Sequence, residues 1–215
     1  MSDRPVIVVG AGGHGAVVAD ALLAQGRTVL GFVDKSAKAA KTLLPGIDLL
    51  GSDDSLDPGG GYDLVNGIGG TGDAAGRDRR RAVQLRLEAL GFRFTGVRHP
   101  SAVVSPHAAI GEGVQLLARC VVQPAARVGA GAIINTGAII EHDCRVGAFT
   151  HCASGAILCG GVEVGQGAHI GAGAVIRQGV RLEARVVVGA GAVVLEAGEG
   201  EGMLIGVPAR RRGTV

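Results

Sequence analysis

Residues 122–157 read VQPAAR VGAGAI INTGAI IEHDCR VGAFTH CASGAI when the chain is divided every six residues. The first letter of each block is aliphatic or Cys, and this phase runs unbroken from Val104 to Val194. Fifteen of the sixteen first positions are Val, Ile or Leu, and the exception is Cys152. The fifth letter is small or slim, and Gly often follows the aliphatic residue directly. The stretch therefore has a strict period of six.

An amphipathic helix repeats every 3.6 residues and an ordinary strand every two, so neither explains a period of six. A hexapeptide repeat does, because each sextet forms a short strand and a turn, and three sextets close one triangular coil. The aliphatic residue then points to the axis, and Gly serves turns with unusual backbone angles. Residues 18 apart should lie about 4.8 Å apart on neighbouring coils. We expect residues 203–210 to cover the open edge of the last coil.

The composition of the 215 residues limits the possible classes of protein. The chain is 47% hydrophobic, and its 39 glycines have no G-X-Y period, which excludes a disordered or collagen-like chain. A net charge of +2 gives no broad attraction for nucleic acid or for membrane lipid. No apolar run approaches the length that spans a membrane, and the N-terminus does not resemble a signal peptide. We therefore expect a cytoplasmic protein.

The cysteines are expected to be packing groups. No two of them form a C-x-x-C pair, and three occupy inward positions of the sextets, where a small apolar group is needed. The mixture of His and Cys between His142 and Cys159 lacks the spacing of a structural zinc site, so we expect no metal. The four residues are Cys120, Cys144, Cys152 and Cys159.

Residues 1–98 are typical of a small α/β domain of four or five strands. A glycine-rich loop, GAGGHG at residues 10–15, lies between an apolar run and a predicted helix, and a second strand ends at Asp34. In such a loop the backbone N–H groups approach a diphosphate at the N-terminus of the helix, and the acid accepts from a ribose hydroxyl. The predicted strands are 5–9, 28–33, 63–68 and 92–97, and the predicted helices are 16–25 and 77–90. The arginines of the second helix, Arg79, Arg80 and Arg86, are most simply a solvated face.

Polar residues interrupt the otherwise apolar repeat at Ile140–Cys144. Residue 160, which is 18 residues after His142, is Gly, so the groove beside this histidine has a floor of backbone that a ligand can approach. By the same count, His151 and His169 should stack on neighbouring coils.

Several motifs together resemble a known family. The sextets and the closing GVPAR at residues 206–210 resemble the left-handed parallel β-helix acyltransferases. The GAGGHG loop, NTGAIIEHDC at 135–144 and the pair Thr150-His151 resemble the sialic-acid O-acetyltransferase-like group of nucleotide-sugar acetyltransferases. Within it, the chain is similar to bacterial enzymes that N-acetylate UDP- or GDP-linked 4-amino-4,6-dideoxy sugars. The resemblance implies a Rossmann-like α/β domain over 1–98 and a left-handed parallel β-helix over 99–215.

The resemblance also implies the roles of residues on the coils. His142 matches the catalytic base of the family, and imidazole can accept the proton that an amine loses when it attacks a thioester. Asp143 matches the acid that orients this ring. Gly160 matches the glycine whose N–H contacts the acetyl carbonyl, and Ala190 lies where relatives bind the coenzyme A arm through a backbone amide. His151 matches a second histidine near the acetyl or sugar group, where it positions rather than takes protons.

In the first domain the resemblance assigns the nucleotide sugar. Gly12, Gly13 and His14 match the loop at its phosphates, Asp34 matches the acid near its nucleoside, and Asn66 and Gly67 line the same cleft. The family uses acetyl-coenzyme A without a metal and forms homotrimers with active sites between subunits.

Three alternatives remain open at this point. The same histidine would serve a hydroxyl group, as in O-acetylation of a free sugar such as sialic acid. A non-catalytic nucleotide-binding β-helix protein would use only the glycine-rich loop. An NAD-dependent oxidoreductase fits the loop as well, although about 98 residues are too few for a two-lobed dehydrogenase domain.

Overall fold

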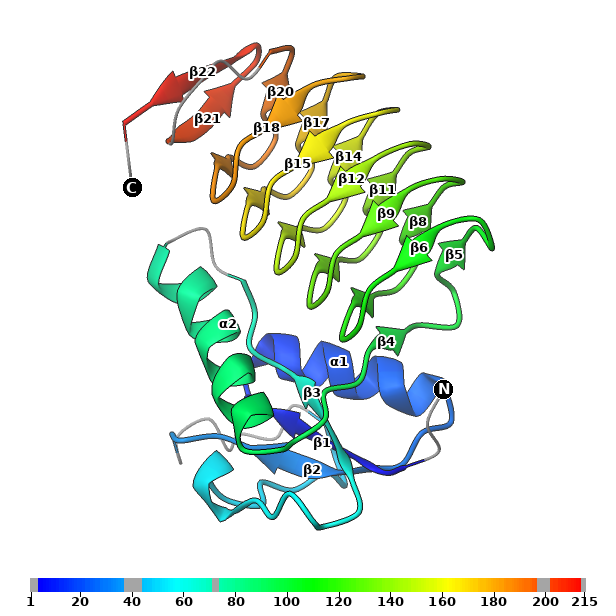
Figure 1. Ribbon diagram of the computed structural model, residues 1–215, viewed down its shortest axis with the longest axis vertical. Coiled ribbons are helices and arrows are strands. Elements are labelled where there is room, and N and C mark those ends of the chain that lie inside the picture. The colour runs from blue at the N-terminus through cyan, green and yellow to red at the C-terminus, as the bar shows by residue number, and fades with distance from the viewer. Residues whose placement is uncertain (1–3, 37–43, 71–73, 197–201, 214–215) are drawn as a thin grey trace.

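The computed structural model describes residues 4–36, 44–70, 74–196 and 202–213, which form an α/β unit followed by a parallel β-helix (Figure 1). The predicted fold class, an α/β region before a parallel β-helix, is confirmed. None of the described helices has the length and apolar character that crossing a bilayer requires.

In the described part of the α/β unit, three strands form a parallel sheet in the order β2-β1-β3, fewer than the four or five strands expected. The predicted strand at 92–97 contributes only a single bridge between Phe94 and Leu64, because the chain then turns to pair with the first coil. Helix α1 begins at Gly13, three residues earlier than predicted, since the Gly12 carbonyl already accepts from the Ala16 N–H. The elements are β1 (Val6–Val9), α1 (Gly13–Ala24), β2 (Val29–Val33), the 3-10 helix η2 (Asp53–Ser55), β3 (Asp63–Asn66) and α2 (Ala74–Ala89).

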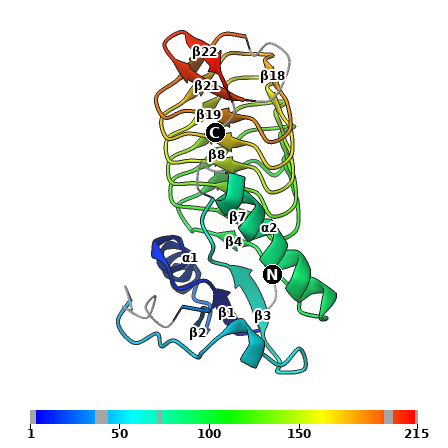
Figure 2. The same cartoon turned by 90° about the vertical axis from the view of Figure 1, so that its left-hand side faces the viewer.

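The two helices cover opposite faces of this sheet. Val18 and Leu22 of α1 pack with Val6 and Val8, and this cluster continues into buried residues of the first coils. Leu87 of α2 packs on the other face of the sheet. As a result, α1 lies between the sheet and the β-helix (Figure 2).

The β-helix is a three-sided prism of short strands whose register is 18 residues, as the period of six predicts. Ile133 pairs with His151, Ile139 with Ile157 and Arg145 with Glu163. The α/β unit covers one sheet, which we call the N-terminal face: β4 (Val97–Arg98), β7 (Gln115–Leu116), β10 (Ile133–Ile134), β13 (His151–Cys152), β16 (His169–Ile170) and β19 (Val187–Val188).

The outward side chains of the other two sheets differ in character. We call one the aliphatic face: β5 (Val103–Val104), β8 (Val121–Val122), β11 (Ile139–Ile140), β14 (Ile157–Leu158), β17 (Val175–Ile176) and β20 (Val193–Val194). We call the other the charged face: β6 (Ala109–Ile110), β9 (Arg127–Val128), β12 (Arg145–Val146), β15 (Glu163–Val164) and β18 (Arg181–Leu182).

The interior is built as the pattern predicts. From Leu116 to Val194, each first residue of a sextet is at most 4% exposed, and the small residues such as Ala132 and Ala156 are fully buried. Ile110 is 38% exposed, because no further coil lies beneath the first one. At the other end, β21 (Met203–Gly206) pairs with β19, and β22 (Ala209–Arg212) pairs with β21, so this hairpin covers the last coil as expected.

The glycines that directly follow the aliphatic residues were predicted to provide unusual backbone angles, but they are needed for close packing instead. A Cβ on Gly147 would lie 2.4 Å from the Gln166 nitrogen of the next coil, so this position needs Gly for close approach. The backbone with positive φ occurs two residues further on in each turn, where Phe149 has φ +56° and Gly131 has φ +64°. The turn glycines therefore meet two separate requirements.

Arg80 attaches α2 to the prism, which corrects the prediction of a solvated arginine face. Its side chain is buried and donates to the carbonyl oxygens of Gly131 and Phe149, and its guanidinium lies 5.5 Å from the centre of the Phe149 ring. Burial lowers the pKa of Arg80 to about 10. Arg185 adds a two-pronged ion pair with Asp78 at the same edge of the prism.

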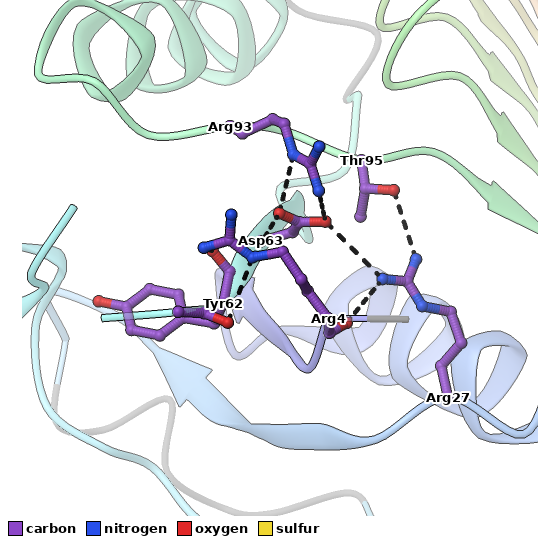
Figure 3. A network of polar contacts seen from close by, with 7 residues as sticks. Arg4, Arg27, Tyr62, Asp63, Arg93 and Thr95 are labelled. Atoms are coloured by element: carbon purple, nitrogen blue, oxygen red, sulfur yellow. Dashed lines mark hydrogen bonds and ion pairs between the residues drawn. The ribbon is translucent and has the colours of Figure 1, made fainter. Parts of the chain in front are cut away.

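A second polar cluster fixes the segment that leads into the coils (Figure 3). The buried Asp63 carboxylate accepts from Nε and Nη2 of Arg93, at 2.9 and 2.7 Å. Arg27 lies 4.0 Å from the same carboxylate and donates to the Thr95 hydroxyl. The start of β3 is thereby tied to the chain just before β4, which fixes the α/β unit relative to the first coil.

Candidate active site

His142 and Asp143 form a hydrogen-bonded pair in the turn between β11 and β12. The distance from His142 Nδ1 to Asp143 Oδ2 is 2.8 Å, and both side chains are more than half exposed. Since a carboxylate only accepts, Nδ1 carries the hydrogen, and in the neutral ring Nε2 is the nitrogen with the free lone pair. Asp143 has φ +61°, at a turn position where most coils place Gly. Asp tolerates this conformation better than most residues.

Gly160, one coil nearer the C-terminus, lies directly against the His142 ring. A Cβ built on Gly160 would be 2.7 Å from both Cε1 and Nε2 of the imidazole, so only glycine permits this arrangement. Among the described residues, the Gly160 N–H donates no hydrogen bond within the chain. The His142 ring and the Gly160 backbone therefore lie against each other on neighbouring coils.

The cysteines near this turn are packing groups, as predicted. The Cys144 Sγ donates to the carbonyl oxygen of Cys159 at 3.2 Å, which joins the turn of His142 to the turn of Gly160. Burial raises the pKa of Cys144 to about 11 and that of Cys152 to about 12, so these side chains are thiols rather than nucleophilic thiolates. All four cysteines are free.

His151 lies on the N-terminal face, away from the turn of His142. Its Nδ1 is 2.8 Å from the Gly70 carbonyl oxygen, so Nδ1 donates, and its Nε2, 3.1 Å from the Asn135 amide nitrogen, accepts. His151 and His169 lie in one column on neighbouring coils as predicted, but their rings meet edge to face, with the ring centres 5.0 Å apart. Burial, and next the neighbouring His169, lower the pKa of His151 to about 3. In the single chain the His151 ring is thus neutral and buried, and both of its nitrogens have partners within the protein.

His14 and Asn66 are held by contacts inside the protein. His14 Nε2 donates to the Gln115 side-chain oxygen at 2.7 Å, and the Gln115 amide donates to the Asn66 carbonyl. The buried Asn66 side chain faces α2, where it donates to the Arg80 carbonyl. Burial lowers the pKa of His14. These residues join the glycine-rich loop, α2 and the prism.

The glycines of the N-terminal loop fall into two groups. A Cβ on Gly15 would lie 2.1 Å from the Gly10 carbonyl oxygen, and one on Gly67 would lie 2.6 Å from a Val8 methyl group. These glycines are required by packing. A Cβ on Gly12 or Gly13 would meet nothing within 4 Å, so the space beside them is open to a ligand.

Asp34 supports this loop. Its Oδ2 accepts from the Ala11 N–H and its Oδ1 from the Ser36 N–H, both at 2.9 Å. The carboxylate therefore lies at the end of β2, beside the open part of the loop.

One chain does not bring all the predicted site residues together. The turns between the aliphatic and charged faces form what we call the His142 edge, which carries His142, Asp143 and Gly160. The turns between the N-terminal and aliphatic faces form the Ala190 edge, which carries Asn135 and the exposed Ala190. The N-terminal loop lies against the N-terminal face. The residues thus form two groups, separated by the aliphatic face.

Sequence reasoning missed Gln115, Asn135 and Gly70. Gln115, Ile133, His151 and His169 form one outward column at intervals of 18, so the register itself identifies Gln115 as a neighbour of the histidines. Gly70 has no place in this repeat. Its carbonyl oxygen contacts His151 only because the α/β unit packs against the prism. Among the described residues, no group of three or more His, Cys, Asp or Glu side chains is arranged to hold a metal.

The lowered pKa of His151 predicts a loss of stability in acid. Between pH 6.5 and about 3 the unfolded chain takes up a proton at this residue and the folded chain does not. The free energy of unfolding should therefore fall as the pH drops through this range, by up to about 1.4 kcal/mol per pH unit for this histidine. Denaturant unfolding of the wild type and His151→Gln at pH 7 and pH 4.5 tests this. A smaller pH dependence is expected in the variant, and equal pH dependence would contradict the prediction.

Comparison with known proteins gives consistent matches over both parts of the chain. The PglD N-terminal domain matches residues 5–79, and the hexapeptide repeat of succinyl-transferase matches residues 153–178 and 161–196. The acetyltransferase domain of PglB from Neisseria gonorrhoeae FA1090 is 34% identical, with a TM-score of 0.87 over 97% of this chain and 100% of that chain. PerB from Caulobacter crescentus, solved with CoA and GDP-perosamine, is 38% identical, with a TM-score of 0.87 over 97% of each chain.

A third structure is more distant. WeeI from Acinetobacter baumannii AYE is 25% identical, with a TM-score of 0.80 over 96% of this chain and 99% of that chain. The search among curated protein sequences gave no match.

Proposed function

The chain belongs to the family of hexapeptide-repeat sugar N-acetyltransferases with a PglD-type N-terminal domain, and on this basis we propose how it acts. It transfers the acetyl group of acetyl-coenzyme A to the 4-amino group of a nucleotide-linked 4-amino-4,6-dideoxy sugar. A GDP-linked sugar of the perosamine type is the preferred substrate and a UDP-linked amino sugar the next. Residues 1–98 hold the nucleotide sugar, and residues 99–215 hold the coenzyme.

The observation that carries this proposal is the His142–Asp143 pair beside Gly160. The amine nitrogen attacks the thioester carbonyl, and Nε2 of His142 takes the proton that the nitrogen loses. Asp143 stabilises the imidazolium that forms. The Gly160 N–H stabilises the negative oxygen of the tetrahedral intermediate. Collapse of this intermediate breaks the carbon–sulfur bond, and the proton leaves with the coenzyme A thiol, so no acyl-enzyme forms.

The active site requires two copies of the chain in this proposal. His142 and Gly160 lie on one edge of the prism, whereas Ala190 lies on another edge and the sugar-binding loop is docked against the N-terminal face. The backbone amide of Ala190 contacts the coenzyme arm, and His151 lies near the acetyl group. A second copy that brings its Ala190 edge and its α/β unit to the His142 edge of the first completes the site.

The aliphatic face supports a closed ring of three copies. Its outward residues are all Val or Ile and are exposed or half-buried in the single chain: Val103, Val121, Ile139, Ile157, Val175 and Val193. A continuous apolar column of this kind marks a protein interface. If three such faces surround one axis, the His142 edge of each copy meets the Ala190 edge of the next, and the ring closes.

A substrate panel tests the proposed reaction. GDP-, UDP- and dTDP-linked 4-amino sugars and free sialic acid are each mixed with acetyl-coenzyme A, and free thiol is measured. Turnover is expected with a nucleotide-linked amino sugar. Turnover only with sialic acid would instead favour O-acetylation, and no thiol release from any acceptor would overturn the enzymatic assignment.

The open space at Gly12 gives a prediction about sugar binding. Gly12→Leu should fold normally, because its Cβ meets nothing within 4 Å, but the side chain fills the space assigned to the diphosphate. We expect affinity for the nucleotide sugar to fall at least about tenfold, with coenzyme A affinity unchanged, in isothermal titration. As a contrast, Gly15→Ala should lower stability by about 1–3 kcal/mol, because its Cβ overlaps the Gly10 carbonyl. Unchanged sugar affinity in Gly12→Leu would exclude the loop from the site.

A further inference from the structure

A pocket opens at the carboxyl ends of β1 and β2, next to the glycine-rich loop. Its apolar walls are Val9, Val33, Ile68 and Val83, and charged groups including Asp34, Asp53 and Arg86 complete it. Ligands of open parallel sheets bind beyond the carboxyl ends of the strands, at such a crevice. Apolar walls with a few charged groups are suited to a flat heterocyclic base.

Asp53 is the unusual residue in this pocket. It begins η2, and its side chain is only 5% exposed. One carboxylate oxygen, Oδ2, accepts from Arg86, whereas Oδ1 accepts no hydrogen bond from any described residue. A second cation, Lys35, has its Nζ 4.0 Å from Oδ1, beyond hydrogen-bonding distance, on a side chain that is 59% exposed.

A buried carboxylate oxygen without a donor is costly, so its presence in a binding pocket needs an explanation. The ion pair with Arg86 does not explain it, because Arg86 donates to the other oxygen, Oδ2. A ligand that brings N–H groups to Oδ1 would satisfy the carboxylate, and the exposed Lys35 side chain can move aside to admit it.

We propose that Asp53 recognises the base of the nucleotide sugar and selects guanine. The proposal rests on the proposed function, in which the α/β unit binds the nucleotide. Guanine presents two adjacent donors, N1–H and the 2-amino group, which a carboxylate accepts together. Uracil presents a single N–H between two carbonyl oxygens, and these oxygens would face the carboxylate. Adenine presents a lone pair at N1 in place of a donor.

The pairing of Asp53 with Arg86 fits this role. Arg86 neutralises the carboxylate while occupying only part of the acceptor capacity of Oδ2, since each carboxylate oxygen has two lone pairs. The guanidinium also holds the carboxylate in one orientation, so that Oδ1 is fixed before the base arrives.

Binding of nucleoside diphosphates tests whether Asp53 selects guanine, and it requires no catalytic step. The dissociation constants of GDP, inosine diphosphate, UDP and ADP are measured by isothermal titration with the full chain. We expect GDP to bind most tightly, inosine diphosphate, which lacks the 2-amino group, about tenfold more weakly, and UDP and ADP more weakly still. UDP binding as tight as GDP binding, or equal affinity for GDP and inosine diphosphate, would overturn the proposal.

Two neighbouring variants sharpen the test. Asp53→Asn should weaken GDP about tenfold or more and leave UDP nearly unchanged, so that the preference for guanine narrows. Asp54→Asn, on the same 3-10 helix but with a side chain that is 67% exposed, is the matched control and should keep the preference. An equal loss for GDP and UDP in Asp53→Asn would contradict base recognition. If Asp53→Asn does not fold, the comparison of GDP with inosine diphosphate in the wild type still decides.

Failure of base recognition by Asp53 can be distinguished from failure of the proposed acetyltransferase function. Failure of the enzymatic assignment would appear as no thiol release with any amino sugar, whatever the binding preference. Failure of base recognition would appear as equal binding of GDP and UDP in an active enzyme.

Discussion

Replacing His142 by Asn is expected to lower kcat by about 10²–10⁴-fold, the usual contribution of a general base. The asparagine amide can still donate to Asp143, 2.8 Å from the ring in the wild type, so the turn should keep its shape. It has no basic nitrogen beside Gly160, so the amine proton has no acceptor when the thioester is attacked. The affinity for the nucleotide sugar should persist, because the sugar-binding loop belongs to the α/β unit. Thiol release under saturating substrates measures kcat, and isothermal titration measures the affinity.

His107 provides the matched control for this substitution. It is an exposed histidine on the same edge of the prism, two coils nearer the N-terminus. Its backbone N–H donates to the Ser105 hydroxyl. His107→Asn should leave kcat unchanged. A wild-type kcat in His142→Asn would remove this residue from the mechanism, whatever the family resemblance.

The period of six predicted the β-helix in nearly every detail, because each coil repeats the same local requirement. An aliphatic side chain, a small partner and a turn recur every six residues, so phase alone places Ile140 inside and His142 outside. The same arithmetic predicts that Gly160 lies beside His142, which the structure confirms. It also separates Ala190 from His142, since 48 residues is not a multiple of 18. The position of these two residues on different edges therefore follows from the sequence.

The contacts between the two parts of the chain were not predictable in this way. The α/β unit has no repeat that fixes its position against the prism, so local pattern gives no register there. Arg80 resembles its exposed neighbours on an amphipathic helix, yet it is buried against two turn carbonyls. The bond from His151 to Gly70 depends on the same docking. Asn66, predicted to line the cleft, instead directs its side chain to α2, because the strand end faces that helix.

Two impaired variants should restore activity when they assemble together. His142→Asn removes the base from one edge, and Gly12→Leu weakens binding at the sugar loop of the α/β unit at least about tenfold. At nucleotide-sugar concentrations well below KM, each of the proposed homotrimers is therefore expected to keep at most about a tenth of wild-type activity. In a mixed trimer, one site pairs an intact His142 with an intact loop from the neighbouring copy. With equal co-expression and random assembly, about three quarters of trimers are mixed and one site in three is intact, so about a quarter of wild-type activity should return.

The outcome separates a shared site from a site within one chain. If His142 acted on a sugar held by its own α/β unit, every copy would remain defective, and co-expression would give no more activity than either variant alone. Differently tagged copies allow mixed trimers to be purified before the thiol assay, so a failure to assemble is not mistaken for a negative result. Ile139→Glu, which places a charge in the aliphatic column, provides the matching control. It should yield monomers by light scattering that lack turnover although their folded β-helix is retained, because neither edge then meets its partner.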